Sequence, residues 1–388
     1  MAALTRRLGA DRLSLLENAA QEAAVRALER WPREGVPTDP NAWLLRVAHN
    51  VAVDALRAER RLVALGTEPN GVVDPPEPQI DDELQLMFLC CHPVLPRAAQ
   101  IALTLKIASG FTSAQIARAF VSDERTIEQR IVRAKQRLRD EAVTLGLPDP
   151  PAYAARVVSV LDVLYLVFNE GHAMPSGDAA IDDGLCDDAL RLVRILCDID
   201  DEAPTAAHAL RALFCFQASR VPARRADDGS LLLLHEQDRT RWRAPLIEEG
   251  LVSLGRAARG RELTRFHLEA GIAASHATAR SHVDTDWRQI VGLYDQLRAC
   301  APSPIVEVNR ALAVAMSAGA IAGLDELDAI PERSLLARYP YALAAYAELH
   351  ASLGHLDAAL SYLDRALAEQ TAPAQRKLLL RKRAAISR

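Results

Sequence analysis

Apolar residues recur at three- and four-residue intervals along almost the whole chain, and this spacing constrains the fold more than any other feature. The intervening residues are rich in Ala, Leu, Arg and Glu, which favour helices. Alternating strand patterns are absent apart from the run at 231–234, which fits one turn of helix or a short strand. The sequence therefore predicts an all-α protein.

Two stretches interrupt the helical pattern and predict domain boundaries. The first, EPNGVVDPPEPQIDDE, combines Pro, Gly and acidic residues, which is typical of an exposed linker, and the second is GLPDPP at 146–151. A chain of 388 residues is also too long for one ordinary core. We predict four parts: a helical domain at 1–61, an acidic linker at 62–83, a second domain at 84–145 and a helical array at 152–388.

The net charge of −5 is unevenly distributed along these parts. Residues 1–61 contain ten Lys or Arg against eight Asp or Glu, residues 97–141 contain nine against five, and 62–96 contains six acids and no Lys or Arg. The Debye length is ~8 Å at physiological salt, so distant acids do not cancel the positive charge of the two basic stretches. Each stretch can therefore form a local phosphate-binding face.

The sequence gives no sign of membrane insertion, export or metal binding. No stretch approaches ~18 uninterrupted apolar residues, and the N-terminus has no apolar signal region, so we expect a cytoplasmic protein without membrane contact. The six cysteines are typical of core positions in a reducing compartment. Cys90, Cys91 and His92 lack a second cluster to complete a tetrahedral site, so we predict no metal and no cofactor.

The first domain has the pattern of two packed helices joined by the loop PREGVPTDPN. Asp39 or Asn41 is placed to cap the second helix. The predicted apolar stripes are Leu16, Ala20, Ala23, Ala24 and Ala27 on the first helix, and Leu44, Val47, Ala48, Val51 and Ala55 on the second. Taken alone, this pattern also fits a helical hairpin whose charged face is merely solvated.

The second domain has the pattern of a helix-turn-helix, in which a short helix and a longer basic helix follow a glycine turn at Gly110. Thr112 or Ser113 can cap the short helix, and Ser122 or Asp123 can cap the long one. The predicted buried residues of the long helix are Ile127, Ile131, Ala134 and Leu138. Its opposite face is rich in Arg and Gln, which can read guanine and adenine in a major groove, or can simply be solvated.

Together the two domains resemble a sigma-70 family transcription initiation factor of the extracytoplasmic-function type (group IV). The resemblance rests on ENAAQEAAVRALERWP, on PREGVPTDPNAWLLRVAHNVAVDALRAERR and on TSAQIARAFVSDERTIEQRIVRAKQRLRD, of which RAKQRLR is the most characteristic run. It implies a region 2 that binds the polymerase β′ coiled coil and opens the −10 element, and a region 4 that reads the −35 element. Core RNA polymerase, including its β flap, and promoter DNA are the implied partners.

The same resemblance implies three sets of site residues. The −35 set is Thr112, Ser113, Arg125, Thr126, Glu128, Gln129, Arg130, Arg133 and Arg137. The −10 set is Asn41, Trp43, Arg46, Asn50, Arg57, Arg60 and Arg61, where Trp43 either packs under the loop or stacks on a base. The polymerase-binding set is Glu17, Asn18, Gln21 and Glu22.

This sequence departs from the family's pattern at a few positions. Asn18 stands where the family usually has Asp, and Ala24 and His172 stand where it has aromatic residues. Family members usually have roughly another helix before the equivalent of Ala3, so we expect that this chain either starts late or has a shortened region 2. We also expect the acidic linker to lie in the nucleic-acid path of the polymerase, where it imitates a phosphate chain. Replacing Asp81, Asp82 and Glu83 with Lys should then alter abortive initiation.

Beyond region 4 the chain resembles sigma factors that carry a tetratricopeptide-like extension. YLVFNEGH, HEQDRTRW, TDWRQIVGLYDQL and PSPIVEVNRALAVAM carry this part of the resemblance. The clearest internal repeat is YALAAYAELHASLGHLDAALSYLDRALAEQTAP, with small or apolar residues at Ala347, Gly354, Ala359, Leu363, Ala366 and Pro373. Such arrays present a surface to a protein or ligand partner, which predicts a regulatory or interaction role.

Two other functions remain open at this stage. A helix-turn-helix regulator could bind DNA without polymerase, and a tetratricopeptide adaptor could have no DNA role. Catalysis is not predicted, because the candidate pairs Glu170–His172, His235–Glu236 and His267–Glu269 lack the spacing of a helical metal motif and no nucleophile elbow is present.

Overall fold

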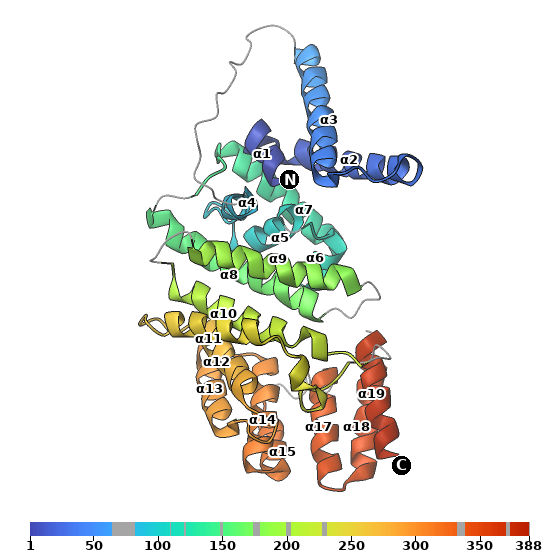
Figure 1. Ribbon diagram of the computed structural model, residues 1–388, viewed down its shortest axis with the longest axis vertical. Helices are drawn as coiled ribbons and strands as arrows, with labels where there is room; N and C mark the ends of the chain where they lie inside the picture. The colour runs from blue at the N-terminus through green and yellow to red at the C-terminus, as the bar shows by residue number, and fades with distance from the viewer. Residues whose placement is uncertain are drawn as a thin grey trace. The chain divides into compact units, whose positions relative to one another are not determined.

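The computed structural model describes residues 1–63, 82–108, 110–119, 122–147, 150–173, 179–198, 203–226, 231–331, 338–369 and 373–387. Within these residues the chain is helical, which confirms the all-α prediction, and the one β feature is an isolated bridge between Arg225 and Leu231 (Figure 1). Leu234 begins a 3-10 turn, so the ambiguous run at 231–234 is neither a full helix nor a strand. The chain forms two compact units, 1–167 and 168–388.

The first unit begins with a short helix and a 3-10 turn, which are followed by a pair of long helices. The elements are α1 (Ala2–Leu8), η1 (Ala10–Arg12), α2 (Leu13–Glu34) and α3 (Pro40–Val63). Leu16, Ala19 and Ala23 of α2 pack with Ala48 and Ala52 of α3 in one buried cluster.

The predicted stripe of α2 is wrong at one position. Ala24 is exposed and Ala19 is buried in its place, because the contact with α3 follows residues 16, 19, 23 and 27.

The linker prediction falls mostly outside the described residues. Positions 64–81, which include Asp81, are not described. Asp82 and Glu83 form the first turn of α4 (Asp82–Cys90), so the last two residues of the predicted linker are helical.

The helix-turn-helix part consists of α5 (Arg97–Ile107), α6 (Ser113–Ala119) and α7 (Glu124–Asp140), preceded by α4. α4 is apolar almost all round, and its residues from Leu84 to Cys90 are buried, as expected for a helix inside a core.

The first part of α8 (Pro150–Ala173) belongs to this same unit, which ends at Val167. Ser159 donates to Gln100 of α5 at 2.7 Å and accepts from Arg97 at 3.3 Å, and Arg97 also forms an ion pair with Asp162. Tyr153 stacks on Phe88, with ring centroids 5.4 Å apart. The unit therefore extends beyond the break predicted at 146–151.

The second unit is a succession of helices. Its α-helices are α9 (Ala179–Asp198), α10 (Thr205–Ser219), α11 (Ala244–Ala257), α12 (Arg265–Thr278), α13 (Trp287–Cys300), α14 (Pro304–Ala318), α15 (Ala320–Asp328), α17 (Pro340–Ser352), α18 (Leu356–Glu369) and α19 (Pro373–Ile386). Three 3-10 turns, η2 (Val221–Ala223), η3 (Leu234–Glu236) and η4 (Arg239–Arg241), lie between α10 and α11.

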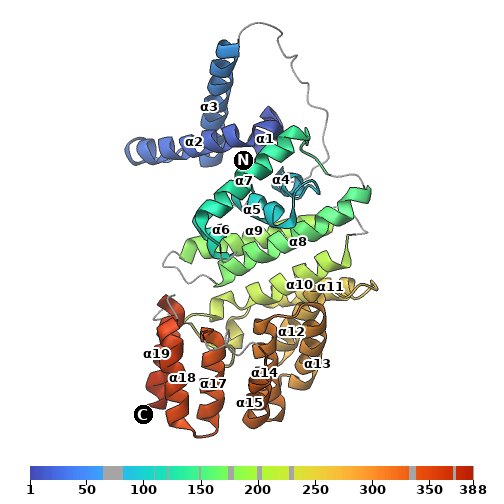
Figure 2. The same cartoon turned by 180° about the vertical axis from the view of Figure 1, so that it is seen from behind.

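The last helices of this unit stack in the manner of a repeat array. α17 buries one face, including Ala342 and Ala345, against α14 and α15, and another face, including Ala347, against α18 and α19. Both views show α17, α18 and α19 side by side (Figures 1 and 2). Gly354 turns the chain between α17 and α18 at φ 78°, a conformation that suits glycine.

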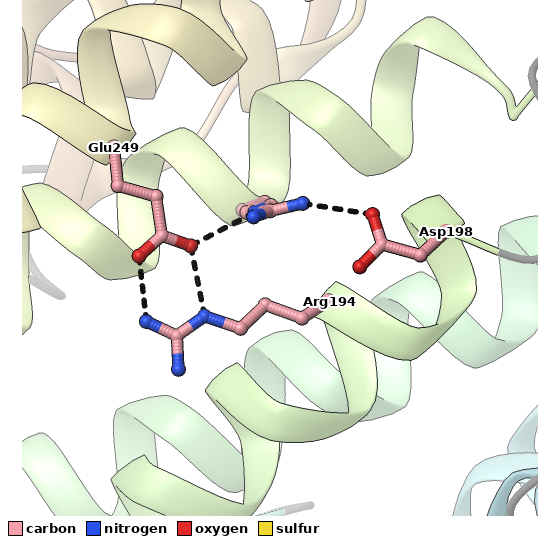
Figure 3. A network of polar contacts seen from close by, with 4 residues as sticks. Arg194, Asp198 and Glu249 are labelled. Atoms are coloured by element: carbon pink, nitrogen blue, oxygen red, sulfur yellow. Dashed lines mark hydrogen bonds and ion pairs between the residues drawn. The ribbon is translucent and has the colours of Figure 1, made fainter.

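A polar network joins α9, α10 and α11. Arg194 donates to both carboxylate oxygens of Glu249, at 2.8 and 2.6 Å, and Arg211 donates to Glu249 at 3.0 Å and to Asp198 at 3.2 Å (Figure 3). The hydrogen bonds from Arg194 hold the pKa of Glu249 at about 2, below its ordinary range, and Arg211 adds to the effect.

Candidate functional site

The recognition helix α7 is held in place by caps and by a buried stripe. Thr112 and Gln115 cap α6 reciprocally, since Gln115 N–H donates to Thr112 Oγ1 at 3.2 Å and Thr112 N–H donates to Gln115 Oε1 at 2.8 Å. Asp123 caps α7 by accepting from Thr126 N–H at 2.8 Å, and the Thr126 hydroxyl beside it lowers the pKa of that carboxyl. Of the alternatives at each cap, Thr112 and Asp123 are therefore the capping residues.

All four predicted core residues of α7 are buried. They face α5 and α6, which turns the opposite side of the helix to solvent.

The exposed side of α7 carries most of the predicted −35 residues. Arg125, Glu128, Gln129, Arg133 and Arg137 are exposed, whereas Arg130 is half-buried. Within the described part of the chain, Arg125, Arg133 and Arg137 form no ion pair with a carboxylate. Unpaired arginines on a rigid helix can contact phosphates and guanine without first losing an internal partner.

Part of this face also lines a groove of about 340 Å³ between α7 and the start of α5. The predicted residues Thr126, Gln129, Arg130, Arg133 and Arg137 contribute to it, together with Leu95, Pro96, Ala98 and Ala99. The groove therefore combines arginines with the first turn of a helix, whose free N–H groups favour anions. Thr112 and Thr126 are engaged in caps, and Ser113 is half-buried.

Two of the predicted −10 residues, Asn41 and Trp43, lie in the first turn of α3, next to the loop that follows α2. Asp39 Oδ1 accepts from Ala42 N–H at 2.9 Å, so Asp39 and not Asn41 is the capping residue, and Asn41 is exposed. Trp43 packs edge-on against Trp31, with ring centroids 5.6 Å apart, as the packing alternative expects.

The remaining −10 candidates lie along α3. Arg46 and Asn50 are exposed, and Arg57 is exposed beside Asp54, with which it pairs at 3.5 Å. Arg60 and Arg61 belong to α3, but their side chains lie outside the described residues.

The four predicted polymerase-binding residues separate into two environments. Asn18, Gln21 and Glu22 are exposed, whereas Glu17 is half-buried between two lysines of region 4. Its carboxylate lies 3.5 Å from Lys106 Nζ and forms a second ion pair with Lys135. The structure therefore engages Glu17 in an internal contact and leaves the other three residues exposed.

Two apolar residues on the same stripe were missed by sequence reasoning. Val25 is 49% exposed and Leu28 is 77% exposed, and both follow Asn18 and Gln21 at helical spacing. Their exposure could have been predicted from the sequence, because Val25 and Leu28 are apolar residues outside the helical stripe that α2 buries against α3.

The contact that engages Glu17 includes further links between the region 2 and region 4 parts of the first unit. Arg139 of α7 donates to the Asp11 carbonyl at 3.0 Å, and Arg6 pairs with Asp82 at 3.0 Å. The exposed residues Arg125, Arg133 and Arg137 of α7 take no part in these links.

The described residues contain no group of three or more His, Cys, Asp or Glu placed to hold a metal ion. Cys90 and Cys91 are buried in the core, and burial raises the pKa of the Cys91 thiol to about 12. His267 caps α12 through Thr264, and Glu236 accepts from Leu233 N–H and from Arg381. The side chains of Glu170 and His172 lie outside the described residues. No described helix is long and apolar enough to cross a membrane.

Comparison with known proteins gives the same order of parts. Residues 1–62 match sigma-70 region 2, residues 85–138 match sigma-70 region 4, and residues 156–258 match a family of unknown function, DUF6596. An uncharacterized protein of Rhizobium meliloti (strain 1021) is 40% identical over 332 residues, which cover 83% of this chain and 78% of that protein. No solved structure matches the chain. With a region 2, a helix-turn-helix region 4 and a helical C-terminal extension in one polypeptide, the chain belongs to the sigma-70 family as a DNA-binding transcription factor of the extracytoplasmic-function type.

Proposed function

We propose that this chain binds core RNA polymerase and directs it to promoters by recognising a −10 and a −35 element. The observation that carries the proposal is the exposed, unpaired arginine face of α7, in a chain that also contains region 2. The domains we propose are region 2 over 1–61, region 4 over 84–145 and a regulatory extension over 152–388.

At the −35 element, α7 enters the major groove with its N-terminal turns. Arg125 and Gln129 then face base edges, where Arg pairs with guanine and Gln with adenine. Arg133 and Arg137 lie one and two turns further on and contact phosphates, with the groove beside α5 as a second phosphate contact.

At the −10 element, the loop before α3 encloses an extruded base. Because Trp43 packs against Trp31, its role is to fix the loop, and Asn41 and backbone groups contact the base. Arg46 and Arg57, followed by Arg60 and Arg61, hold the strand by its phosphates.

Toward the polymerase, the exposed stripe of α2 supplies both polar and apolar contacts. Asn18, Gln21 and Glu22 are followed by Val25 and Leu28, a pattern that suits packing against the helices of the β′ coiled coil. Glu17 supports the stripe from inside through Lys106 and Lys135 and does not itself contact polymerase.

Promoter-specific transcription with purified components tests the proposal. The full chain is added to core polymerase on a pool of promoter fragments, and transcripts that require the chain support it. A double variant, Val25→Ser with Leu28→Ser, should lose these transcripts, while the exposed pair Glu29→Gln with Arg30→Gln should retain them. DNA binding without polymerase would favour an independent helix-turn-helix regulator, and neither activity would favour an adaptor.

A further inference from the structure

Two arginines and two histidines lie together in the second unit, and we call them the arginine–histidine cluster. They are Arg220 after α10, Arg239 in η4, His276 at the end of α12, and His282 in the turn before α13. Arg239 Nη1 donates to the carbonyls of His276 and Ala279, at 2.8 Å each, and Arg220, His282 and Arg239 all act electrostatically on the His276 ring. Both histidine rings pack edge-on against Trp287, with centroids 5.3 Å away.

The cluster carries positive charge without a carboxylate in contact. Within the described residues, neither Arg220 nor Arg239 forms an ion pair, and Arg220 donates only to the neutral Gln217. Asp284 and Glu348 are the acids nearest to Arg239 and His282, and they act from beyond ion-pair distance.

Burial and the neighbouring positive charges both lower pKa values in the cluster. Burial, followed by the charges of Arg224 and Arg239, lowers the pKa of Arg220 to about 10. Burial, followed by Arg220, His282 and Arg239, lowers the pKa of His276 to about 4. An added negative charge would relieve this repulsion between neighbouring cations.

Several polar side-chain atoms of the cluster and of residues beside it are buried and have no hydrogen-bond partner among the described residues. They are Arg239 Nη2, His276 Nδ1, His282 Nδ1, Trp242 Nε1 and Thr285 Oγ1. Trp242 and Thr285 are 7% and 6% exposed, so solvent does not satisfy these two side chains. The ring of the exposed His235 lies 5.5 Å from the His282 ring, so the cluster borders on a side chain at the surface.

We propose that the arginine–histidine cluster binds a doubly charged oxyanion, the phosphate group of a small molecule. Two guanidinium groups balance its charge, and Trp242, Thr285 and the histidines donate hydrogen bonds to its oxygens. The anion then joins the end of α10, η4 and the α12–α13 corner, so the extension is a receptor for a phosphate-bearing signal. This site is separate from the DNA-binding and polymerase-binding surfaces proposed above.

Titration calorimetry and thermal unfolding of the full chain test the site without polymerase or DNA. The probes are inorganic phosphate, sulfate and phenyl phosphate, each compared with chloride at equal ionic strength. We expect saturable binding and a higher melting temperature with the dianions. Tighter binding of phenyl phosphate would identify a phosphate ester as the ligand, and equal binding would identify the free anion.

Matched variants separate the cluster from general charge effects. Arg220→Gln and His282→Gln should each weaken binding about tenfold, as expected for loss of a charge-assisted hydrogen bond. Arg241→Gln, which removes an exposed arginine from the same segment, should bind like the wild type. Ring ¹⁵N signals of His276 and His282 should move on phosphate addition in the wild type and in Arg241→Gln.

Two results would overturn the proposal. One is the absence of saturable binding for all three dianions, with histidine signals that do not move. The other is equal weakening by Arg241→Gln and Arg220→Gln. If Arg220→Gln fails to fold, His282→Gln and the histidine signals still decide between these outcomes.

Discussion

Glu17 was expected to bind polymerase, but its surroundings favour a structural role. It is half-buried between Lys106 and Lys135, so Glu17→Gln leaves two sheltered lysines without their partner. We expect this substitution to lower the unfolding free energy of the first unit by about 1–3 kcal/mol. Differential scanning calorimetry should record the loss as a lower melting temperature of that unit.

Glu22→Gln is the control for this substitution on the same helix. Glu22 is exposed and pairs with Arg26 at 3.0 Å, four residues away, so its loss should cost about 0.5 kcal/mol or less. If Glu17→Gln is as mild as Glu22→Gln but weakens polymerase binding, Glu17 contacts the polymerase directly and the structural role is wrong.

Glu249 should make the second unit sensitive to acid. Its pKa of about 2 lies below its ordinary value, so its contribution is complete above about pH 4.5 and is lost as the pH falls toward 2. Glu249→Gln should therefore lower the unfolding free energy by about 1–3 kcal/mol at pH 7, and the difference from wild type should vanish near pH 2. Urea unfolding over this pH range, with exposed Glu248→Gln as the control, measures the effect; a difference independent of pH would contradict it.

Within the helix α7, we expect the N-terminal residues to contact bases and the later residues to contact phosphates. Arg125→Ala and Gln129→Ala remove side chains near the N-terminal turns and should relax −35 preference at a cost of about 1–3 kcal/mol each. Arg133→Ala removes a phosphate contact and should weaken binding to all sequences alike, with a smaller salt dependence. Binding of the polymerase complex to a library of −35 variants at several salt concentrations distinguishes the two classes. Identical behaviour of both classes would show that α7 has a different orientation in the groove.

The elements of this protein are predictable from sequence because their signals are local. The buried stripe of α7 and the glycine turn before α6 follow from spacing within a few residues. Each predicted cap had two candidates, and hydrogen bonds select Asp39, Thr112 and Asp123. The exposure of Ala24 was not predictable, since Ala fits either side of a helix that is rich in alanine.

The site residues held by distant contacts are beyond such reasoning. Glu17 meets Lys135 across 118 residues of sequence, and Arg239 meets His276 across 37. Nothing in the local pattern of either segment selects its partner, because the pairing depends on how whole helices pack.

At the scale of the whole molecule, α8 matters because it belongs to the first unit as far as Val167. Ser159 and Asp162 bind α5, and Tyr153 stacks on Phe88 of α4, so the start of the extension supports the DNA-binding part. A truncation placed at the sequence break at 146–151 removes these contacts, whereas one placed after Ala173 keeps them.

The two truncations should therefore behave differently. The chain 1–173 should melt cooperatively and keep promoter-dependent transcription, altered only by loss of the regulatory array. The chain 1–147 should melt at a lower temperature and lose activity, because Gln100, Arg97 and Phe88 lose their partners on α8. Calorimetry and transcription on the same two proteins measure both effects. Equal stability of 1–147 and 1–173 would show that α8 serves the extension alone, and the regulatory domain would then begin where the sequence break predicts.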